Sequence, residues 1–178
     1  MNDLTRRQLV LIRDLFTAAE QRSLPLWLEN GWAIDARLRR VTRDHEDIDV
    51  VYPKERETEY VKLLHALGFD RRVDTDYGFL IWKGDVLLDT EACHRYENGF
   101  GFPGFPPDSC PLVKSGELDG LEVRCVSWEA MYVEFLGYLN EIPTAEWRAK
   151  DFESFRLIEA QVPEPVRLRL RREYGDPA

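Results

Sequence analysis

The stretch from Trp27 to Tyr52, WLENGWAIDARLRRVTRDHEDIDVVY, decides the fold that we expect for this chain. It begins within a short apolar run, which is typical of a buried strand. The dipeptide Asn30-Gly31 indicates a turn, because both residues tolerate a positive φ and glycine does so without steric cost. The predicted order is a strand at 24–28, a turn at 30–31, a helix at 32–38, a charged loop at 39–46 and a strand at 47–52.

Two carboxylates, Asp47 and Asp49, lie at positions i and i+2 of the second predicted strand. Successive strand side chains point to opposite faces, so these two share one face while Ile48 and Val50 share the other. Mg²⁺ is commonly held by one or two carboxylates together with phosphate oxygens, and a glycine turn before a helix offers backbone N–H groups to phosphate. An Asp-x-Asp pair alone is as consistent with two solvated surface carboxylates. With the turn and the helix, it predicts a metal–nucleotide site.

A third carboxylate, Asp89, lies in a predicted hairpin. Residues 77–83 are rich in aromatic side chains, Gly84-Asp85 forms the turn, and residues 86–92 return antiparallel. On the returning strand Leu87, Asp89 and Glu91 share one face. An isolated aspartate there is a common edge-strand charge. Beside the Asp-x-Asp strand, it would instead complete the carboxylate set of a two-metal site.

Gly31 and the following Arg43-x-His45-x-Asp47-Ile-Asp49 motif resemble the signature of the polymerase-β-type nucleotidyltransferases. Within that superfamily the chain is similar, over nearly its whole length, to the aminoglycoside 2''-nucleotidyltransferases, and more loosely to the lincosamide nucleotidyltransferases. One departure is that the family usually has Gly-Gly or Gly-Ser at the turn, where this chain has Asn30-Gly31. The phrases that carry the similarity are GWAIDARL (31–38), RVTR (40–43), DYGFL (76–80), LLD (87–89), SCP (109–111), VRC (123–125) and SWEA (127–130).

This resemblance implies an α/β (α+β) fold with a mixed sheet. Residues 1–125 would form the nucleotidyltransferase domain, and residues 126–178 a small helical domain that closes the acceptor cleft. The implied activity is Mg²⁺-dependent transfer of a nucleoside monophosphate, AMP from ATP, to a hydroxyl of an aminoglycoside, with release of pyrophosphate and with two ions in the site. The alternatives are the same chemistry on a lincosamide or another acceptor, and a nucleotide-binding module of this fold without turnover.

The resemblance also implies a role for each candidate site residue. The metal ligands and catalytic groups are Asp47, Asp49 and Asp89, with Asp89 serving the metal or acting as general base on the acceptor hydroxyl. Nucleotide phosphates would be bound by Asn30, Gly31, Arg43, His45 and Lys150. The ammonium groups and rings of the acceptor would meet Glu91, Glu134, Glu141 and Tyr77.

Two further segments bear on the site. Residues 94–107 predict a long loop rich in glycine, proline and phenylalanine, which could cover a ligand or pack on the core. After residue 125 the composition becomes helical, with Ser127 as the cap of one helix and Pro143-Thr144 as the start of the next. On that second helix Lys150 faces away from the apolar contact of Phe152, as a phosphate-binding or a solvated lysine would.

Composition narrows the class of protein. The 178 residues are 44% hydrophobic and 12% aromatic, which indicates a globular chain. The formal net charge of −9 argues against nucleic acid or an anionic membrane as partner and suits a cationic small molecule, although acidity also serves solubility alone. Three unpaired cysteines and the lack of a membrane span or signal peptide predict a cytoplasmic location. We expect a monomer or a weak dimer.

Overall fold

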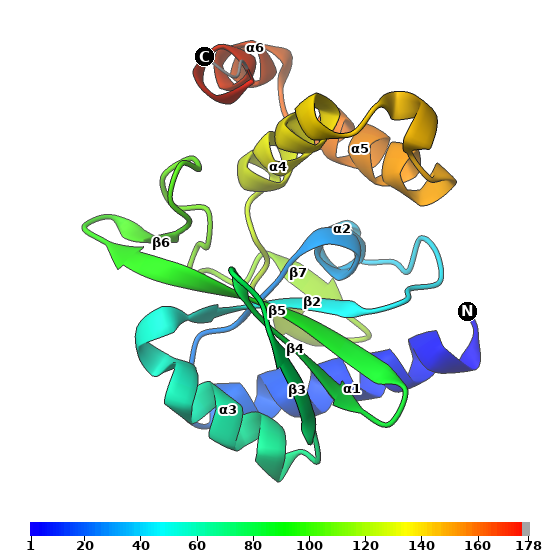
Figure 1. Ribbon diagram of the computed structural model, residues 1–178, viewed down its shortest axis with the longest axis vertical. Coiled ribbons are helices and arrows are strands. Elements are labelled where there is room, and N and C mark those ends of the chain that lie inside the picture. Colours follow the sequence, from blue (N-terminus) through cyan, green and yellow to red (C-terminus); the bar gives the residue numbers. More distant parts are fainter. Residues whose placement is uncertain (176–178) are drawn as a thin grey trace.

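The computed structural model describes residues 1–175 as a mixed sheet with helices on both faces (Figure 1). The strand order is β1-β2-β5-β4-β3, β6 pairs with the far end of β5, and only β2 and β5 run parallel. The predicted fold class is therefore confirmed. The strands are β1 (Trp27–Leu28), β2 (Ile48–Pro53), β3 (Arg71–Asp74), β4 (Gly78–Lys83), β5 (Val86–Tyr96) and β6 (Gly99–Gly101), with a separate ribbon of β7 (Gly116–Leu118) and β8 (Leu121–Val123).

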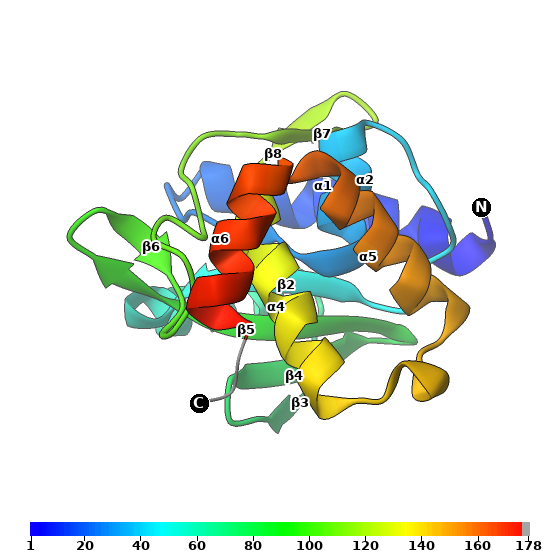
Figure 2. The ribbon, with the colours of Figure 1, turned by 90° about the horizontal axis from the view of Figure 1, so that it is seen from above.

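Helices lie on both sides of the sheet, in one layer on one side and in more than one tier on the other (Figures 1 and 2). One face is covered by α1 (Asp3–Glu20) and α3 (Glu57–Ala66), which contact each other. The other carries α2 (Asn30–Leu38), α4 (Trp128–Glu141), α5 (Ala149–Gln161) and α6 (Glu164–Tyr174), and two short 3₁₀ helices are η1 (Lys54–Arg56) and η2 (Thr144–Glu146). None of the helices within residues 1–175 has both the length and the apolar character needed to cross a membrane.

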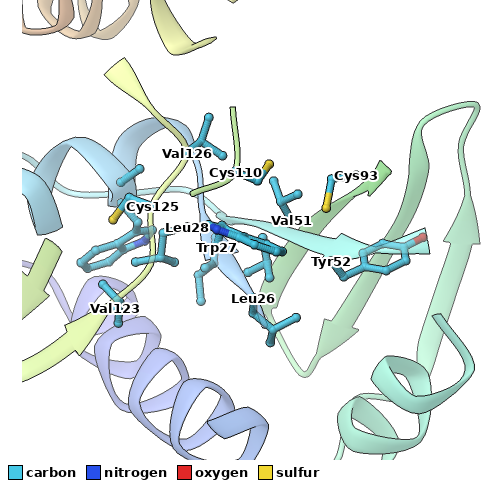
Figure 3. Close-up of a cluster of buried hydrophobic side chains, with 14 of the residues drawn as sticks. Leu26, Trp27, Leu28, Val51, Tyr52, Cys93, Cys110, Val123, Cys125 and Val126 are labelled. Carbon is cyan, nitrogen blue, oxygen red and sulfur yellow. The ribbon is translucent and has the colours of Figure 1, made fainter. Parts of the chain in front are cut away.

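The core lies at the meeting of β1, β2 and β5 with the loops that lead into α4 (Figure 3). Trp27 and Tyr52 are fully buried, and the indole N–H of Trp27 donates to the carbonyl of Pro111 at 2.7 Å. Burial of such large aromatic side chains stabilises the fold by about 2–3 kcal/mol each. All three cysteines, Cys93, Cys110 and Cys125, are buried and free.

The first predicted strand is shorter than expected. The sequence predicts a strand over 24–28, but β1 contains only Trp27 and Leu28. Leu24 instead continues the end of α1, because its N–H donates to the carbonyl of Ala19 at 3.0 Å. Pro25 has no N–H to donate, so pairing begins only after it.

The predicted long loop at 94–107 is partly a hairpin. Strand β5 continues to Tyr96 and pairs with β6, which carries Phe100. Phe100 and Phe102 are buried, so this segment contributes to the core. The alternation of phenylalanine with glycine in this segment indicates a strand. The sequence analysis did not predict one, because glycine is unfavourable in strands.

The helix that carries Lys150 begins later than predicted. Pro143 precedes the 3₁₀ turn η2, and α5 begins at Ala149, where Arg148 and Asp151 form a reciprocal capping box. Lys150 therefore lies in the first turn of α5 and not in its middle. A cation in the first turn opposes the helix dipole, which favours anions there.

Candidate active site

A row of carboxylates crosses β2 and β5 and ends at Glu29, which directly follows β1. The parallel register of β2 and β5 places Asp49 opposite Asp89, and the N–H of Glu29 donates to the carbonyl of Asp49 at 3.1 Å. Glu91 follows two residues after Asp89 on the same face of β5. Their neighbours in sequence are buried toward the core, whereas Asp49, Asp89 and Glu91 remain partly exposed. The predicted sharing of one face is confirmed for Asp89 and Glu91, whereas Asp47 lies just before β2, which begins one residue later than the predicted strand.

A cavity of about 190 Å³ opens above this row, between the start of α2 and the helices α4 and α5. Seven of the residues predicted from the sequence line it, namely Asn30, Gly31, Arg43, Asp47, Asp49, Glu134 and Lys150. The other lining residues are Ile34, Phe135, Tyr138, Arg148, Asp151 and Ser154. Carboxylates thus form one side of the cavity, and cations at the start of α5 form the other.

The remaining predicted residues lie outside the cavity lining. Asp89 is half-buried beside it, and the hydroxyl of Tyr77 donates to its Oδ2 at 3.3 Å. Glu91 lies one step further along β5. Glu141 is exposed at the last residue of α4, and the structure does not bring it to the other acidic residues.

Burial and mutual repulsion raise the pKa values of these carboxyls. Burial, and then the charges of Asp47, Asp89 and Glu134, raise the pKa of Asp49 well above its ordinary value, against a hydrogen bond from the Asn30 side chain. Burial is also the main cause that raises the pKa of Glu91 and of Glu134 to about 7. A cation bound among them would lower these pKa values and relieve the repulsion.

The chemistry of Asp47 and Asp49 fits a divalent cation. Both carboxylates line the cavity, and burial and the neighbouring carboxylates raise the pKa of Asp49, an effect that a divalent cation would oppose. Within residues 1–175, no three His, Cys, Asp or Glu side chains are arranged to hold a metal ion by themselves. Mg²⁺ does not require such a set, since it usually takes one or two carboxylates and completes its shell with water and nucleotide phosphate oxygens.

The start of α2 differs from the predicted turn. Asn30, with a φ of 48°, takes the left-handed conformation, and Gly31 does not. Glycine is needed at 31 for a different reason: a Cβ there would lie 2.7 Å from both Arg43 Nη2 and His45 Nδ1. The bare Gly31 backbone therefore lets the Arg43 side chain approach the cavity.

His45 is held behind Gly31. Its side chain is buried, its ring lies 4.2 Å from the Trp32 ring, and its Nε2 is 2.6 Å from Asp35 Oδ2. A carboxylate only accepts hydrogen bonds, so Nε2 carries the proton and Nδ1 faces Gly31. His45 is thus placed to support the backbone around Gly31, with no direct opening onto the cavity lining.

Asp35 is a site residue that sequence reasoning missed. It is fully buried, and its Oδ1 accepts hydrogen bonds from the N–H and the hydroxyl of Thr42 at 3.0 and 2.5 Å. Its Oδ2 accepts a hydrogen bond from His45. The Asp35 carboxylate therefore holds Thr42 and His45, the residues on either side of Arg43 in the loop that leads to Asp47. The sequence could have indicated Asp35, because it is four residues after Gly31 and so lies on the same face of the helix as the predicted phosphate turn.

We expect Asp35→Asn to act on the nucleotide and not on the acceptor. An amide cannot accept all three hydrogen bonds, so the Thr42–His45 segment loses its fixed position and the KM for the nucleotide rises about tenfold. The KM of the acceptor should change less than twofold. Steady-state kinetics and the imidazole ¹⁵N shifts of His45 measure the two effects, with exposed Asp14→Asn as control. A folded variant with an unchanged KM for the nucleotide would contradict this role.

The start of α5 supplies the cations of the cavity. Lys150, in the first turn, forms an ion pair with Glu46, and Arg148 Nη1 lies 3.9 Å from the same carboxylate. The hydrogen bond and charge of Lys150 lower the pKa of Glu46. Two cations at a helix start are an arrangement that favours phosphate, and here the guanidinium of Arg148 also donates to both carboxylate oxygens of Asp151 at 3.0 Å. Arg148 was not predicted, because the start of this helix was placed too early.

The fold and the site together define a nucleotidyltransferase: carboxylates on a mixed sheet face a cationic helix start across one cavity. The chain belongs to the aminoglycoside-2''-adenylyltransferase family, whose model matches residues 11–146. A 2''-aminoglycoside nucleotidyltransferase of Klebsiella pneumoniae is 41% identical over 172 residues, which cover 94% of this chain and 97% of the relative. A relative of the same name from Escherichia coli gives the same identity and coverage.

Solved structures agree with this family. ANT(2'')-Ia in complex with adenylyl-2''-tobramycin superposes with a TM-score of 0.88 at 40% identity, over 94% of this chain and 99% of that one. The lincosamide adenylyltransferase LnuA, bound to lincomycin, gives a TM-score of 0.63 at 18% identity, over 89% of this chain and 99% of that one. This second likeness shows the shared fold alone.

Proposed function

We propose that this chain transfers AMP from ATP to the 2''-hydroxyl of an aminoglycoside and releases pyrophosphate. The observation that carries this proposal is the single cavity between the Asp47–Asp49 pair and the cationic start of α5, in a chain that is 41% identical to 2''-aminoglycoside nucleotidyltransferases. The acidic side suits a polycationic acceptor, and the basic side suits a triphosphate.

On the nucleotide side, Asp47 and Asp49 would hold Mg²⁺, which supplies charge neutralisation at the triphosphate when bound. Arg43, Lys150 and the backbone at Gly31 bind and orient the phosphates, so that the α-phosphate faces the acceptor. Positioning and charge stabilisation account for most of the acceleration in reactions of this class. Two Mg²⁺ ions could be held if Asp89 also served as a metal ligand beside Asp47 and Asp49.

On the acceptor side, Asp89 would accept the proton of the attacking hydroxyl. Tyr77 donates to Asp89 and so holds its carboxylate in place. Glu91 and Glu134 would pair with ammonium groups of the acceptor. Residues 126–178 would form the wall that closes this side, because Glu134 and Tyr138 of α4 line the cavity opposite the sheet.

One experiment tests the proposal. The protein is incubated with ATP, Mg²⁺ and a panel of aminoglycosides and lincosamides, and each antibiotic is analysed by mass spectrometry for an added AMP. Adduct on an aminoglycoside at the 2''-position, assigned by NMR, is the expected result. Adduct on a lincosamide alone would favour the second acceptor class, whose enzymes share this fold. Nucleotide binding without any adduct would indicate a module that lacks turnover.

Lys150 and Glu46 should change ATP binding in opposite directions. Lys150→Ala removes a charge-assisted phosphate contact, so the KM for ATP should rise about 10- to 100-fold. Glu46→Gln frees the same lysine from its carboxylate partner, so the KM should fall roughly 2- to 5-fold. Initial rates at varied ATP and saturating acceptor measure both. Equal effects on the KM of the acceptor, or no effect of Lys150→Ala, would make Lys150 a surface residue.

A further inference from the structure

A second cavity, of about 540 Å³, opens beside the loop that joins α2 to β2. Residues 39–44 of this loop line it, together with Leu9 of α1 and the turn of the β7–β8 ribbon. The loop lies on the same side of the molecule as the N-terminus, away from the hairpin of β5 and β6 (Figures 1 and 2). This cavity is therefore distinct from the acceptor side of the candidate active site, which β5 forms.

Arg43 connects the two cavities, because it lines both of them. Its Nη2 packs so closely on Gly31 that a Cβ there would lie 2.7 Å away, and its Nη1 donates to the carbonyl of Asp44 at 3.1 Å. The guanidinium thus lies between Gly31 of the active site and the loop wall of the second cavity. An anion that moves past Arg43 leaves the first cavity and enters the second.

The carboxylates of the second cavity already have partners. Glu117 lies 3.7 Å from the guanidinium of Arg39. Asp119 accepts a hydrogen bond from Arg13 at 2.9 Å, and Asp44 accepts two from the start of α1, at 2.7 and 3.1 Å. Since each acid has its own donor, the positive charge of the loop is not cancelled by these acids.

Arg40 and Arg43 are the two arginines of this cavity that form no ion pair within residues 1–175. The backbone that carries them is held by Asp35, whose carbonyl accepts from the N–H of Arg40 and whose carboxylate accepts from Thr42, both at 3.0 Å. Guanidinium groups bind phosphate oxygens in pairs, and a backbone fixed before binding lowers the entropy cost. The second cavity is thus suited to a phosphate anion.

The proposed reaction releases such an anion beside Arg43. As the bond between the acceptor oxygen and the α-phosphorus forms, the bond from that phosphorus to the bridging oxygen breaks, and its electron pair leaves with pyrophosphate. In-line attack puts this leaving group opposite the acceptor hydroxyl, which Asp89 serves from β5. In the proposed function Gly31, Arg43 and Lys150 form the opposite, nucleotide side, so pyrophosphate is released next to Arg43.

We propose that the cavity lined by residues 39–44 binds inorganic pyrophosphate through Arg40 and Arg43 and is the route by which this product leaves the active site. The inference rests on the proposed function and adds to it a product site away from the carboxylate row. Arg43 contacts the diphosphate from both cavities, and Arg40 binds it on the far side. Arg40 therefore acts on the product and has no part in binding ATP or in the chemical step.

The test is Arg40→Gln, which keeps a long polar side chain and removes the charge and the fork. The inhibition constant of added pyrophosphate, measured from initial rates of AMP transfer, should rise about tenfold. The Kd for Mg·ATP and the single-turnover rate should change less than twofold, because Arg40 does not line the active-site cavity. Arg40→Lys, which keeps the charge, should recover part of the affinity for pyrophosphate.

Exposed Arg169→Gln on α6 controls for the loss of one positive charge and should leave the inhibition constant unchanged. An inhibition constant within twofold of the wild type in Arg40→Gln would overturn the product site and leave the proposed function standing. A parallel rise in the Kd for Mg·ATP would also overturn it, since the cavity would then hold the triphosphate of the substrate. Calorimetry with pyrophosphate and the protein alone separates the two proposals. Binding that Arg40→Gln weakens, in a protein that forms no adduct with any antibiotic, would overturn the proposed function only.

Discussion

Asp49→Asn should abolish measurable AMP transfer while the protein remains folded. Asp49 is the carboxylate on the sheet that lines the cavity and lies opposite Asp89, so its loss removes a ligand from the expected Mg²⁺ position. Charge stabilisation by a bound metal contributes several kcal/mol to the transition state, so a loss of at least about 10³-fold in kcat is expected. Asp47→Asn should have the same direction of effect.

The stability of the same variant should change in the opposite direction. Burial and the charges of three neighbouring carboxylates raise the pKa of Asp49, so the folded protein without metal gains stability when that charge is removed. The sign follows from linkage: a carboxyl with a raised pKa costs the folded state stability as pH rises above about 4. Thermal unfolding at pH 7.5 with EDTA should show a higher melting temperature for Asp49→Asn than for the wild type.

Three measurements decide this prediction. Product formation is followed by mass spectrometry at 10 mM Mg²⁺, unfolding by calorimetry, and ATP binding with and without Mg²⁺. Exposed Asp14→Asn controls for a general loss of charge. Turnover near the wild-type value in either the Asp47 or the Asp49 variant would exclude a metal site built on this pair.

The sequence predicted the carboxylate site well because local periodicity determined it. Strand alternation alone put Asp47 with Asp49 and Asp89 with Glu91, and the hairpin at Gly84 fixed the direction of β5. The parallel pairing of β2 with β5 could not be derived that way, since it joins residues 40 apart. The sequence placed Asp89 beside the Asp47–Asp49 strand in a mixed sheet, and the parallel register came only with the structure.

The missed residues were missed for different physical reasons. Asp35 acts through buried hydrogen bonds to Thr42 and His45, which become neighbours only when the loop folds back on α2. Arg148 was missed because η2 displaced the start of α5 by several residues.

Asp89→Asn should lower kcat by roughly 10²–10⁴-fold while ATP still binds. An alcohol is a poor nucleophile until its proton is removed, and Asp89 is the partly exposed carboxylate beside the cavity whose position is fixed by Tyr77. Burial is the main cause that raises its pKa, opposed by the Tyr77 hydrogen bond and assisted by the charge of Asp47. An amide keeps the shape and the partner of Asp89 but cannot accept a proton.

The role of Asp89 as a general base predicts how kcat changes with pH. A general base works when ionised, so kcat of the wild type should fall as pH drops through the raised pKa of Asp89. That acidic limb should be absent from the small residual rate of Asp89→Asn. Tyr77→Phe should keep the limb and shift it to higher pH, because the hydrogen bond that stabilises the ionised form is lost.

The pair of values that decides between base and metal ligand is the Kd for Mg·ATP and the single-turnover rate, both measured in Asp89→Asn. A general base leaves the Kd within about twofold and lowers only the rate. A metal ligand raises the Kd and lowers the rate in proportion, and part of that loss should be recovered at high Mg²⁺ because mass action refills a weakened site. A single-turnover rate within a few-fold of the wild type would remove Asp89 from the chemistry, and the row across β2 and β5 would then serve binding alone.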